Sequence, residues 1–76
     1  MLQIPGIDME KTGQNITRLR RQAGLSVRQL QKLCGFSSPQ AIYKWQAGQS
    51  LPSIDNLLIL SSVFHCRIDD ILIRRQ

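Results

Sequence analysis

Hydrophobic residues recur at helical spacing along most of the chain, in short runs separated by glycine, proline and serine. In the first run, Ile16, Leu19 and Ala23 lie three and four positions apart, which predicts a helix with one buried face. Asp8 is the expected N-cap of this helix, with Thr12 as the alternative start if the glycine after it interrupts the first turn.

Two shorter helices are predicted after this one. Ser26 followed three residues later by Gln29 has the spacing of a capping box, which starts a helix over about residues 27–34. Gly24 and Gly35 are the expected left-handed stops before and after it. The apolar residues of this helix form one inward stripe: Val27, Leu30 and Leu33.

The second short helix is predicted to begin at Ser38-Pro39, where a capping hydroxyl precedes a proline at the first helical position. Ile42 and Trp45 share its inward face, and a glycine ends it. Phe36, in the corner between the helices, is expected to fill the core. Such a helix-turn-helix pair cannot bury its apolar stripes alone, so the flanking segments are expected to hold it.

The remainder of the chain predicts two further helices. The first begins after a Ser53 cap and carries apolar residues on more than one face, so it is expected to pack centrally as the main core former. Its apolar residues are Ile54, Leu57, Leu58, Leu60, Val63 and Phe64. A last helix is predicted over about residues 68–73. Residues 1–8 are interpreted as a tail and residues 74–76 as a frayed end.

Composition and charge narrow the possible partners. A chain of 76 residues, 42% of them hydrophobic, is expected to form one domain, residues 1–76, with a single small core. Its net charge is +5, and positions 11–54 contain seven basic residues and no acidic one. This distribution favours a polyanionic partner over the helix pair. The alternative is a solvated basic face that keeps the protein soluble.

Other classes of function have little support in the sequence. The first residues lack the pattern of a signal peptide, and no apolar run is long enough to span a membrane, so a cytoplasmic protein is expected. Cys34 and Cys66 do not form a metal-site pattern with His65, and buried reduced thiols are expected instead. With one histidine and no glycine-rich phosphate loop, we expect no enzyme, cofactor or metal site.

The order and spacing of several short segments resemble the Cro and phage-repressor type of helix-turn-helix protein, the XRE family. The resembling segments are residues 18–26, Leu30, Gly35, residues 42–48, residues 51–53, residues 55–57 and residues 68–72. The resemblance spans about residues 12–72. It implies an all-α, five-helix, lambda-repressor-like DNA-binding domain whose third helix enters the major groove.

Family roles, carried over position by position, place base reading on the third helix. The implied base-reading residues are Pro39, Gln40, Ala41, Tyr43 and Lys44. Their chemistry agrees: glutamine can bond an adenine edge, lysine can donate to guanine, and alanine or a tyrosine ring can meet a thymine methyl. Gln40 and Lys44 are four residues apart and share one helix face. By spacing alone, ordinary solvated helix residues would be the better explanation of this pair.

The resemblance also places contacts to the DNA backbone around the helix pair. The implied residues are Arg20, Ser26, Val27, Arg28, Lys32, Ser38, Gln49 and Ser50. The chain departs from the family pattern in this region. Val27 replaces a glutamine that commonly bonds a phosphate, and the corner at residues 35–39 is one residue longer than usual. Gln46 replaces a glutamate that often pairs with the residue at Arg20, which leaves that arginine a hydrogen bond and an unneutralised charge.

These observations predict sequence-specific binding of double-stranded DNA by a transcriptional regulator, a repressor that acts by occupying its operator. A homodimer, if formed, would use the fourth and fifth helices or pair on DNA. The alternative is an antitoxin or adaptor whose main role is to bind a protein partner, because the apolar fifth helix offers a possible surface.

Overall fold

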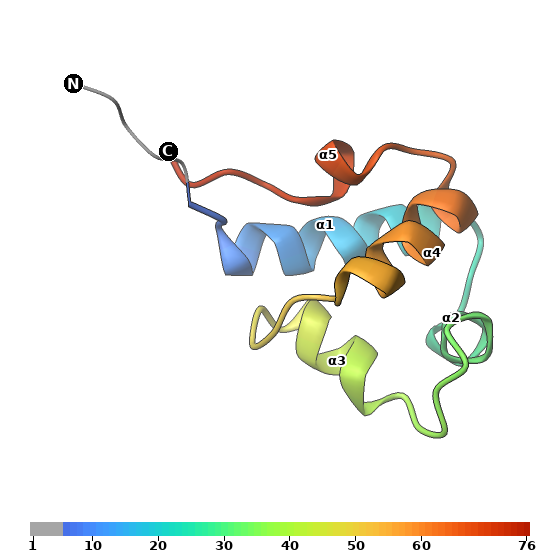
Figure 1. Ribbon diagram of the computed structural model, residues 1–76. Helices are drawn as coiled ribbons and strands as arrows, with labels where there is room; N and C mark the ends of the chain where they lie inside the picture. Colours follow the sequence, from blue (N-terminus) through green and yellow to red (C-terminus); the bar gives the residue numbers. More distant parts are fainter. Residues whose placement is uncertain (1–5) are drawn as a thin grey trace.

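The computed structural model describes residues 6–76, which form five helices packed around one core (Figure 1). The helices are α1 (Met9–Gln22), α2 (Val27–Leu33), α3 (Gln40–Gln46), α4 (Ile54–Phe64) and α5 (Ile68–Ile71). α2 and α3 lie on one side of α1, and α5 lies on the other side in Figure 1. The predicted all-α, five-helix architecture is confirmed.

The core is built from apolar residues of all five helices: Ile16, Leu19, Leu30, Ile42, Trp45, Leu57, Leu60, Phe64 and Ile71. In the first two helices, two predicted core positions are wrong. Ala23 is exposed because it is the C-cap of α1, where Gly24 turns the chain away with a φ of 72°. Leu33 is 50% exposed, since it is the last residue of α2 and only Leu30 of that helix is fully buried.

The prediction that α4 packs centrally is half right. Leu57, Leu60 and Phe64 are buried on its inner face. Ile54 and Leu58 are 72% and 56% exposed. They lie four residues apart and therefore share the outer face of the helix, so α4 keeps an apolar surface in contact with solvent.

Helix α1 packs directly onto the end of α3 through two glycines. A Cβ at Gly13 would lie 2.5 Å from the Trp45 carbonyl oxygen, so only a hydrogen fits there. A Cβ at Gly48, where φ is 75°, would lie 3.0 Å from the Cα of Glu10. Gly13 does not interrupt the first turn, because α1 begins at Met9 with Asp8 as its N-cap.

The helix starts follow local capping chemistry with one exception. The caps at Asp8, at Ser26 with Gln29, and at Ser53 are present as predicted. The predicted Ser38 cap is wrong: Pro39 itself is the N-cap of α3, without a side-chain hydrogen bond, and the helix begins at Gln40. Ser38 therefore lies one residue too far from the helix to cap it.

The end of α5 differs from expectation, and its start is held without a side-chain cap. No cap side chain bonds its first turn, and instead the Asp70 carboxylate accepts the Arg67 N–H at 3.0 Å. The helix is shorter than predicted and ends at Ile71, because the chain becomes extended at Leu72.

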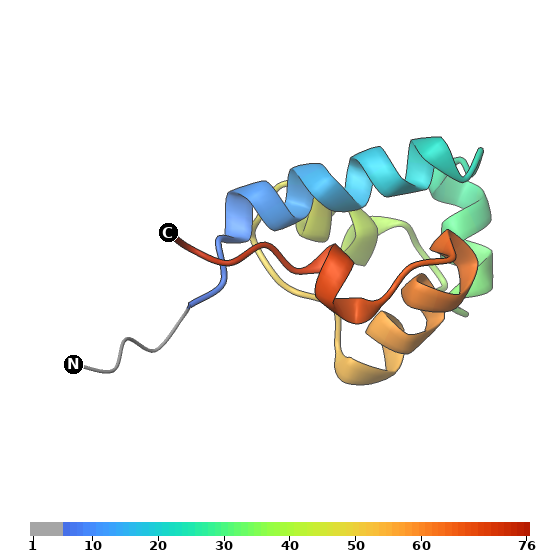
Figure 2. The same cartoon turned by 90° about the horizontal axis from the view of Figure 1, so that it is seen from above.

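The C-terminal residues, expected to fray, pair with the segment that precedes α1. Ile7 and Arg74 form an antiparallel β-bridge, and the Arg75 N–H donates to the Gly6 carbonyl at 2.8 Å. Figure 2 shows the C-terminal segment running back to the start of α1. Residues 6–8 of the predicted tail are therefore paired, and residues 1–5 lie outside the described residues.

Two buried polar side chains of α1 fix this C-terminal segment. Thr12 Oγ1 accepts the Ile73 N–H at 2.9 Å. Asn15 Nδ2 donates to the Asp70 and Ile71 carbonyls at 2.8 and 3.0 Å. Arg18 donates twice to the Asn15 Oδ1, which orients the amide so that its NH₂ group faces α5.

Both cysteines are free thiols that lie half-buried against the core, so the expectation of full burial is only partly met. Burial raises the pKa of the Cys34 thiol. Burial and the negative charge of Asp70 raise the pKa of Cys66, against an opposing effect of Arg18.

Candidate nucleic-acid interface

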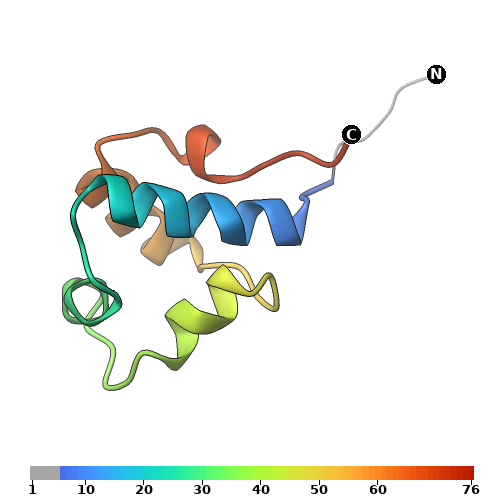
Figure 3. The same ribbon diagram turned by 180° about the vertical axis from the view of Figure 1, so that it is seen from behind.

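The helix pair α2 and α3 lies on one side of α1, with the corner of residues 34–39 between the two helices (Figure 3). The pair is anchored by the ring of Phe36, which meets the ring of Trp45 edge to face at 5.7 Å. Phe36 packs against the core, as predicted for the corner. The outer residues of α3 are thus held by a buried aromatic contact on its inner face.

Helix α3 divides into a buried and an exposed face. Ile42 and Trp45 are 0% and 4% exposed and fix the helix to the core. Gln40, Tyr43 and Lys44 are exposed, so three of the five predicted base-reading residues face solvent. The other two, Pro39 and Ala41, are half-buried, and Ala41 packs against the core.

A shallow hollow brings predicted residues from both helices together. It has a volume of about 310 Å³ and is lined by Val27, Arg28 and Gln31 of α2 and by Pro39 and Tyr43. Two predicted base-reading residues, Pro39 and Tyr43, thus lie beside two predicted backbone-contacting residues, Val27 and Arg28. Members of the two sets thus share one surface hollow.

The first turn of α2 is closed by its own capping box. Ser26 Oγ accepts the Gln29 N–H at 3.0 Å, and Gln29 Oε1 accepts the Ser26 N–H at 2.8 Å. The Ser26 N–H is therefore already engaged in the free protein. Val27 and Arg28 carry the remaining first-turn N–H groups, which have no acceptor within the helix.

The other predicted backbone contacts lie around the same surface. Lys32 is exposed in the last turn of α2, and Ser38 is half-buried in the corner. Gln49 is exposed and Ser50 half-buried in the loop after α3. The Gln49 N–H donates to the Lys44 carbonyl at 2.9 Å, so Gln49 offers its side chain rather than its backbone.

Arg20 links the start of α2 to the end of α3. Its Nε donates to Gln46 Oε1 at 3.0 Å, and its Nη1 donates to the Leu25 carbonyl at 2.8 Å. The predicted hydrogen bond between Arg20 and Gln46 is confirmed. Because Gln46 is neutral, the guanidinium charge remains uncompensated by this pair.

The basic residues of the helix pair carry free charge. Among residues 6–76 the one ion pair is Arg67–Asp69 at 4.0 Å, and both side chains are highly exposed. No carboxylate within that range lies at ion-pair distance from Arg20, Arg28 or Lys44. The surface around α2 and α3 therefore keeps its positive charge available for an anionic partner.

Sequence reasoning missed the residues that set the positions of α3 and α5. Gly13 and Asn15 act through contacts with α3 and α5, and the spacing of apolar residues carries no signal for either contact. It also missed Arg21 and Thr17, which lie beside Gln46 in a groove along α1. The neutral Gln46 opposite Arg20 was the one feature that pointed to this region.

A helix-turn-helix family model matches residues 16–71, which is most of the chain. The protein belongs to the XRE helix-turn-helix family. As a member of this family, the protein is a DNA-binding transcriptional regulator, and it binds DNA through its helix-turn-helix. Members of the family are non-enzymatic. No curated protein matches the sequence significantly.

Two solved structures are similar to this chain. One is the restriction-modification controller protein C.AhdI from Aeromonas hydrophila, with 28% identity, a TM-score of 0.73 and coverage of 84% of this chain and 96% of that chain. The other is a transcriptional regulator from Listeria innocua, with 26% identity, a TM-score of 0.72 and coverage of 80% of this chain and 56% of that chain. Both similarities support the lambda-repressor-like arrangement.

Within residues 6–76, none of the helices has the length and apolar character that crossing a membrane requires. In the same part of the chain, no three His, Cys, Asp or Glu side chains gather in a way that could hold a metal ion.

Proposed function

We propose that this XRE-family protein is a repressor that occupies a specific operator with α3 in the major groove. The observation that carries the proposal is the division of α3: Ile42 and Trp45 are buried, while Gln40, Tyr43 and Lys44 face outward beside α2. An α-helix fits the major groove, where each base pair presents a distinct pattern of donors and acceptors. The similarity to C.AhdI and to the Listeria innocua regulator supports this role.

Gln40 and Lys44 are the proposed central base readers. Both are exposed and lie one helical turn apart on α3. The amide of Gln40 suits the N6 and N7 edge of adenine, and the ammonium group of Lys44 suits O6 and N7 of guanine. Tyr43 and Ala41 are proposed to meet thymine methyl groups, with Pro39 beside them.

The backbone contacts are proposed to hold α3 from two sides. Arg28 and Lys32, with the N–H groups at the start of α2, would contact phosphates on one side of the groove. Gln49 and Ser50 would do so on the other. Arg20 and Ser38 complete the proposed set of backbone contacts, together with Ser26 and Val27.

We also propose that the protein forms a homodimer through the outer face of α4. Ile54 and Leu58 are exposed on one face of that helix, although both are large and apolar. A second copy would bury them, and a two-fold axis would place two α3 helices on two half-sites of a palindrome. The α5 helix, next to α4, would lie at the edge of this contact.

The alternative, an antitoxin or adaptor that binds another protein, was predicted to use the apolar fifth helix. Ile71 of that helix is buried and Ile68 and Leu72 pack against the core, so the exposed residues of α4 are the apolar surface such a partner would use. The two proposals differ in their dependence on salt. A repressor should show specific DNA affinity that falls steeply with salt, because phosphate contacts release counterions. An adaptor without DNA function should show neither specificity nor a steep salt dependence.

Titration of a selected duplex and a scrambled duplex at several salt concentrations tests the proposed function. We expect the selected duplex to bind at least about 10³-fold more tightly than the scrambled one. Equal and weak binding of both duplexes would contradict the repressor and favour the protein-binding alternative.

A further inference from the structure

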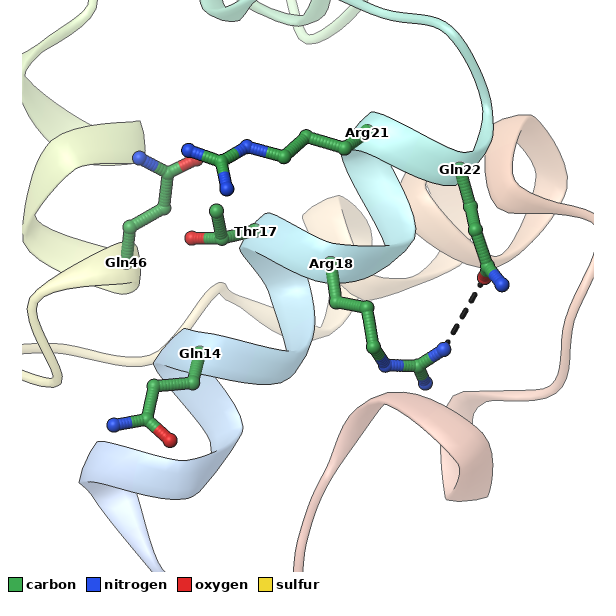
Figure 4. Close-up of a pocket in the computed structure, with 6 residues that line it drawn as sticks. All are labelled: Gln14, Thr17, Arg18, Arg21, Gln22 and Gln46. Carbon is green, nitrogen blue, oxygen red and sulfur yellow. Dashed lines mark hydrogen bonds between the residues drawn. The ribbon is translucent and has the colours of Figure 1, made fainter.

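A second basic surface lies along α1, outside the base-reading residues. A groove of about 610 Å³ runs along this helix and reaches the end of α3 (Figure 4). The residues that line it are Gln14, Thr17, Arg18, Arg21, Gln22 and Gln46. They supply two guanidinium groups, three amides and one hydroxyl, and no carboxylate. This chemistry suits an oxyanion.

Two of the polar groups in the groove are already engaged. The Arg18 guanidinium donates to Asn15 Oδ1 at 2.7 and 3.2 Å and to Gln22 Oε1 at 3.2 Å (Figure 4 shows the bond to Gln22). The Thr17 hydroxyl donates to the Gly13 carbonyl at 3.2 Å. Arg18 and Thr17 therefore shape the groove, and the donors for a ligand come from other residues.

The donors that lie where the groove meets α3 are those of Arg21 and Gln46. Figure 4 shows the Arg21 side chain extending along α1 toward Gln46, with Thr17 beside it. Within residues 6–76, no carboxylate lies at ion-pair distance from Arg21. Gln46 Oε1 accepts from Arg20 Nε at 3.0 Å, which fixes the amide and leaves its NH₂ group as a donor.

We infer that Arg21 and Gln46 together bind a phosphate of the DNA backbone, beyond the contacts of α2 and α3. The inference rests on the proposed function. Gln46 is the last residue of α3, and Arg20 connects it to the Leu25 carbonyl just before α2. The site is thus continuous with the helix pair and extends the DNA interface onto α1. A guanidinium group matches the geometry of a phosphate diester better than an ammonium group does.

Salt titrations of three variants on the selected duplex test this site. For Arg21→Gln, the slope of log K against log salt should fall by about 0.9, the value for one phosphate contact. Over a fourfold rise in salt, wild-type protein should then lose about 3.5-fold more affinity than this variant. Arg21→Lys keeps the charge and should retain the wild-type slope. Arg67→Gln removes an equal charge from the start of α5 and serves as the matched control.

A second measurement separates a contact from a general effect of charge. Ethylation of single phosphates should weaken wild-type binding at one position where it no longer weakens Arg21→Gln. Gln46→Glu should weaken binding as well, since its carboxylate would pair with the arginines and repel the phosphate. Because Arg21 is exposed, its variants should keep the wild-type urea midpoint.

The outcomes distinguish this site from the proposed function. If wild-type protein selects a sequence but Arg21→Gln has the slope of Arg67→Gln, the phosphate site is overturned and the repressor proposal stands. An acidic protein segment would then be the remaining candidate for the groove. If wild-type protein selects no sequence, the proposed function itself fails, and the phosphate site fails with it.

Discussion

Gly13 of α1 lies so close to Trp45 of α3 that a methyl group at position 13 would come within 2.5 Å of the Trp45 carbonyl oxygen. The neighbouring Gln46 carbonyl oxygen would lie 2.7 Å from the same methyl group. Since α3 carries the proposed base readers, this contact sets how far they project from the domain. A residue in the first helix thus determines the position of the third.

Gly13→Ala should destabilise the fold by about 1–3 kcal/mol, because α1 and α3 must separate to admit the methyl group. Helix propensity alone predicts the opposite, an increase of roughly 0.5–1 kcal/mol in the free energy of unfolding. Urea unfolding measures the difference, with Gln14→Ala on the exposed side of the same helix as the control. A stabilised Gly13→Ala variant would contradict the close contact.

Asn15→Ala should destabilise the protein by about 1–3 kcal/mol, because it leaves the Asp70 and Ile71 carbonyls without their donor. Native-state hydrogen exchange should show the largest loss of protection at the Ile73 N–H, which lies in the same C-terminal segment and is bonded to Thr12 of α1. Gln22→Ala, which removes only an exposed partner of Arg18, is the matched control. Equal unfolding free energies for the two variants would argue against Asn15 as the link to α5.

Ile54→Glu should shift the protein toward the monomer, because a carboxylate on the outer face of α4 cannot be buried without a partner. Sedimentation equilibrium measures the change. Leu33→Glu places the same charge on another exposed apolar side chain, at the end of α2, and should leave self-association unchanged. A wild-type protein that remains monomeric at high concentration and on its duplex would rule out the proposed dimer.

Local chemistry made much of the fold predictable. The caps at Asp8, Ser26 and Ser53 depend on residues three positions apart, and all three formed as their spacing indicated. The predicted cap at Ser38 did not form, because the neighbouring Pro39 takes the N-cap position itself. Where two local signals overlap, spacing does not decide which residue begins the helix.

Contacts between distant segments were not predictable from the pattern. The bonds from Asn15 reach residues 55 and 56 positions away, and a polar residue on a helix gives no sign of such a partner. The outer face of α4 illustrates the converse. Apolar residues predicted burial, but Ile54 and Leu58 face solvent, because a helix that is apolar on more than one face does not show which face packs against the core.

Only part of the candidate interface could be predicted from the sequence, for the same reason. The exposure of Gln40 and Lys44 follows from the periodicity of α3, with Ile42 and Trp45 on the opposite face. The proximity of Arg21 to Gln46 depends on the angle between α1 and α3, which Gly13 sets. That angle is a property of the packed domain rather than of any single segment.

The claim that α3 reads bases is tested most directly by selecting bound sites from a random duplex library with wild-type protein and Lys44→Ala in parallel. We expect the wild-type protein to enrich one palindromic consensus. Lys44→Ala should enrich the same consensus with one position per half-site relaxed, at a cost of about 1–3 kcal/mol on the wild-type site. An equal loss of affinity on every sequence, with the consensus unchanged, would contradict base reading by Lys44, and no enrichment by wild-type protein would contradict the account as a whole.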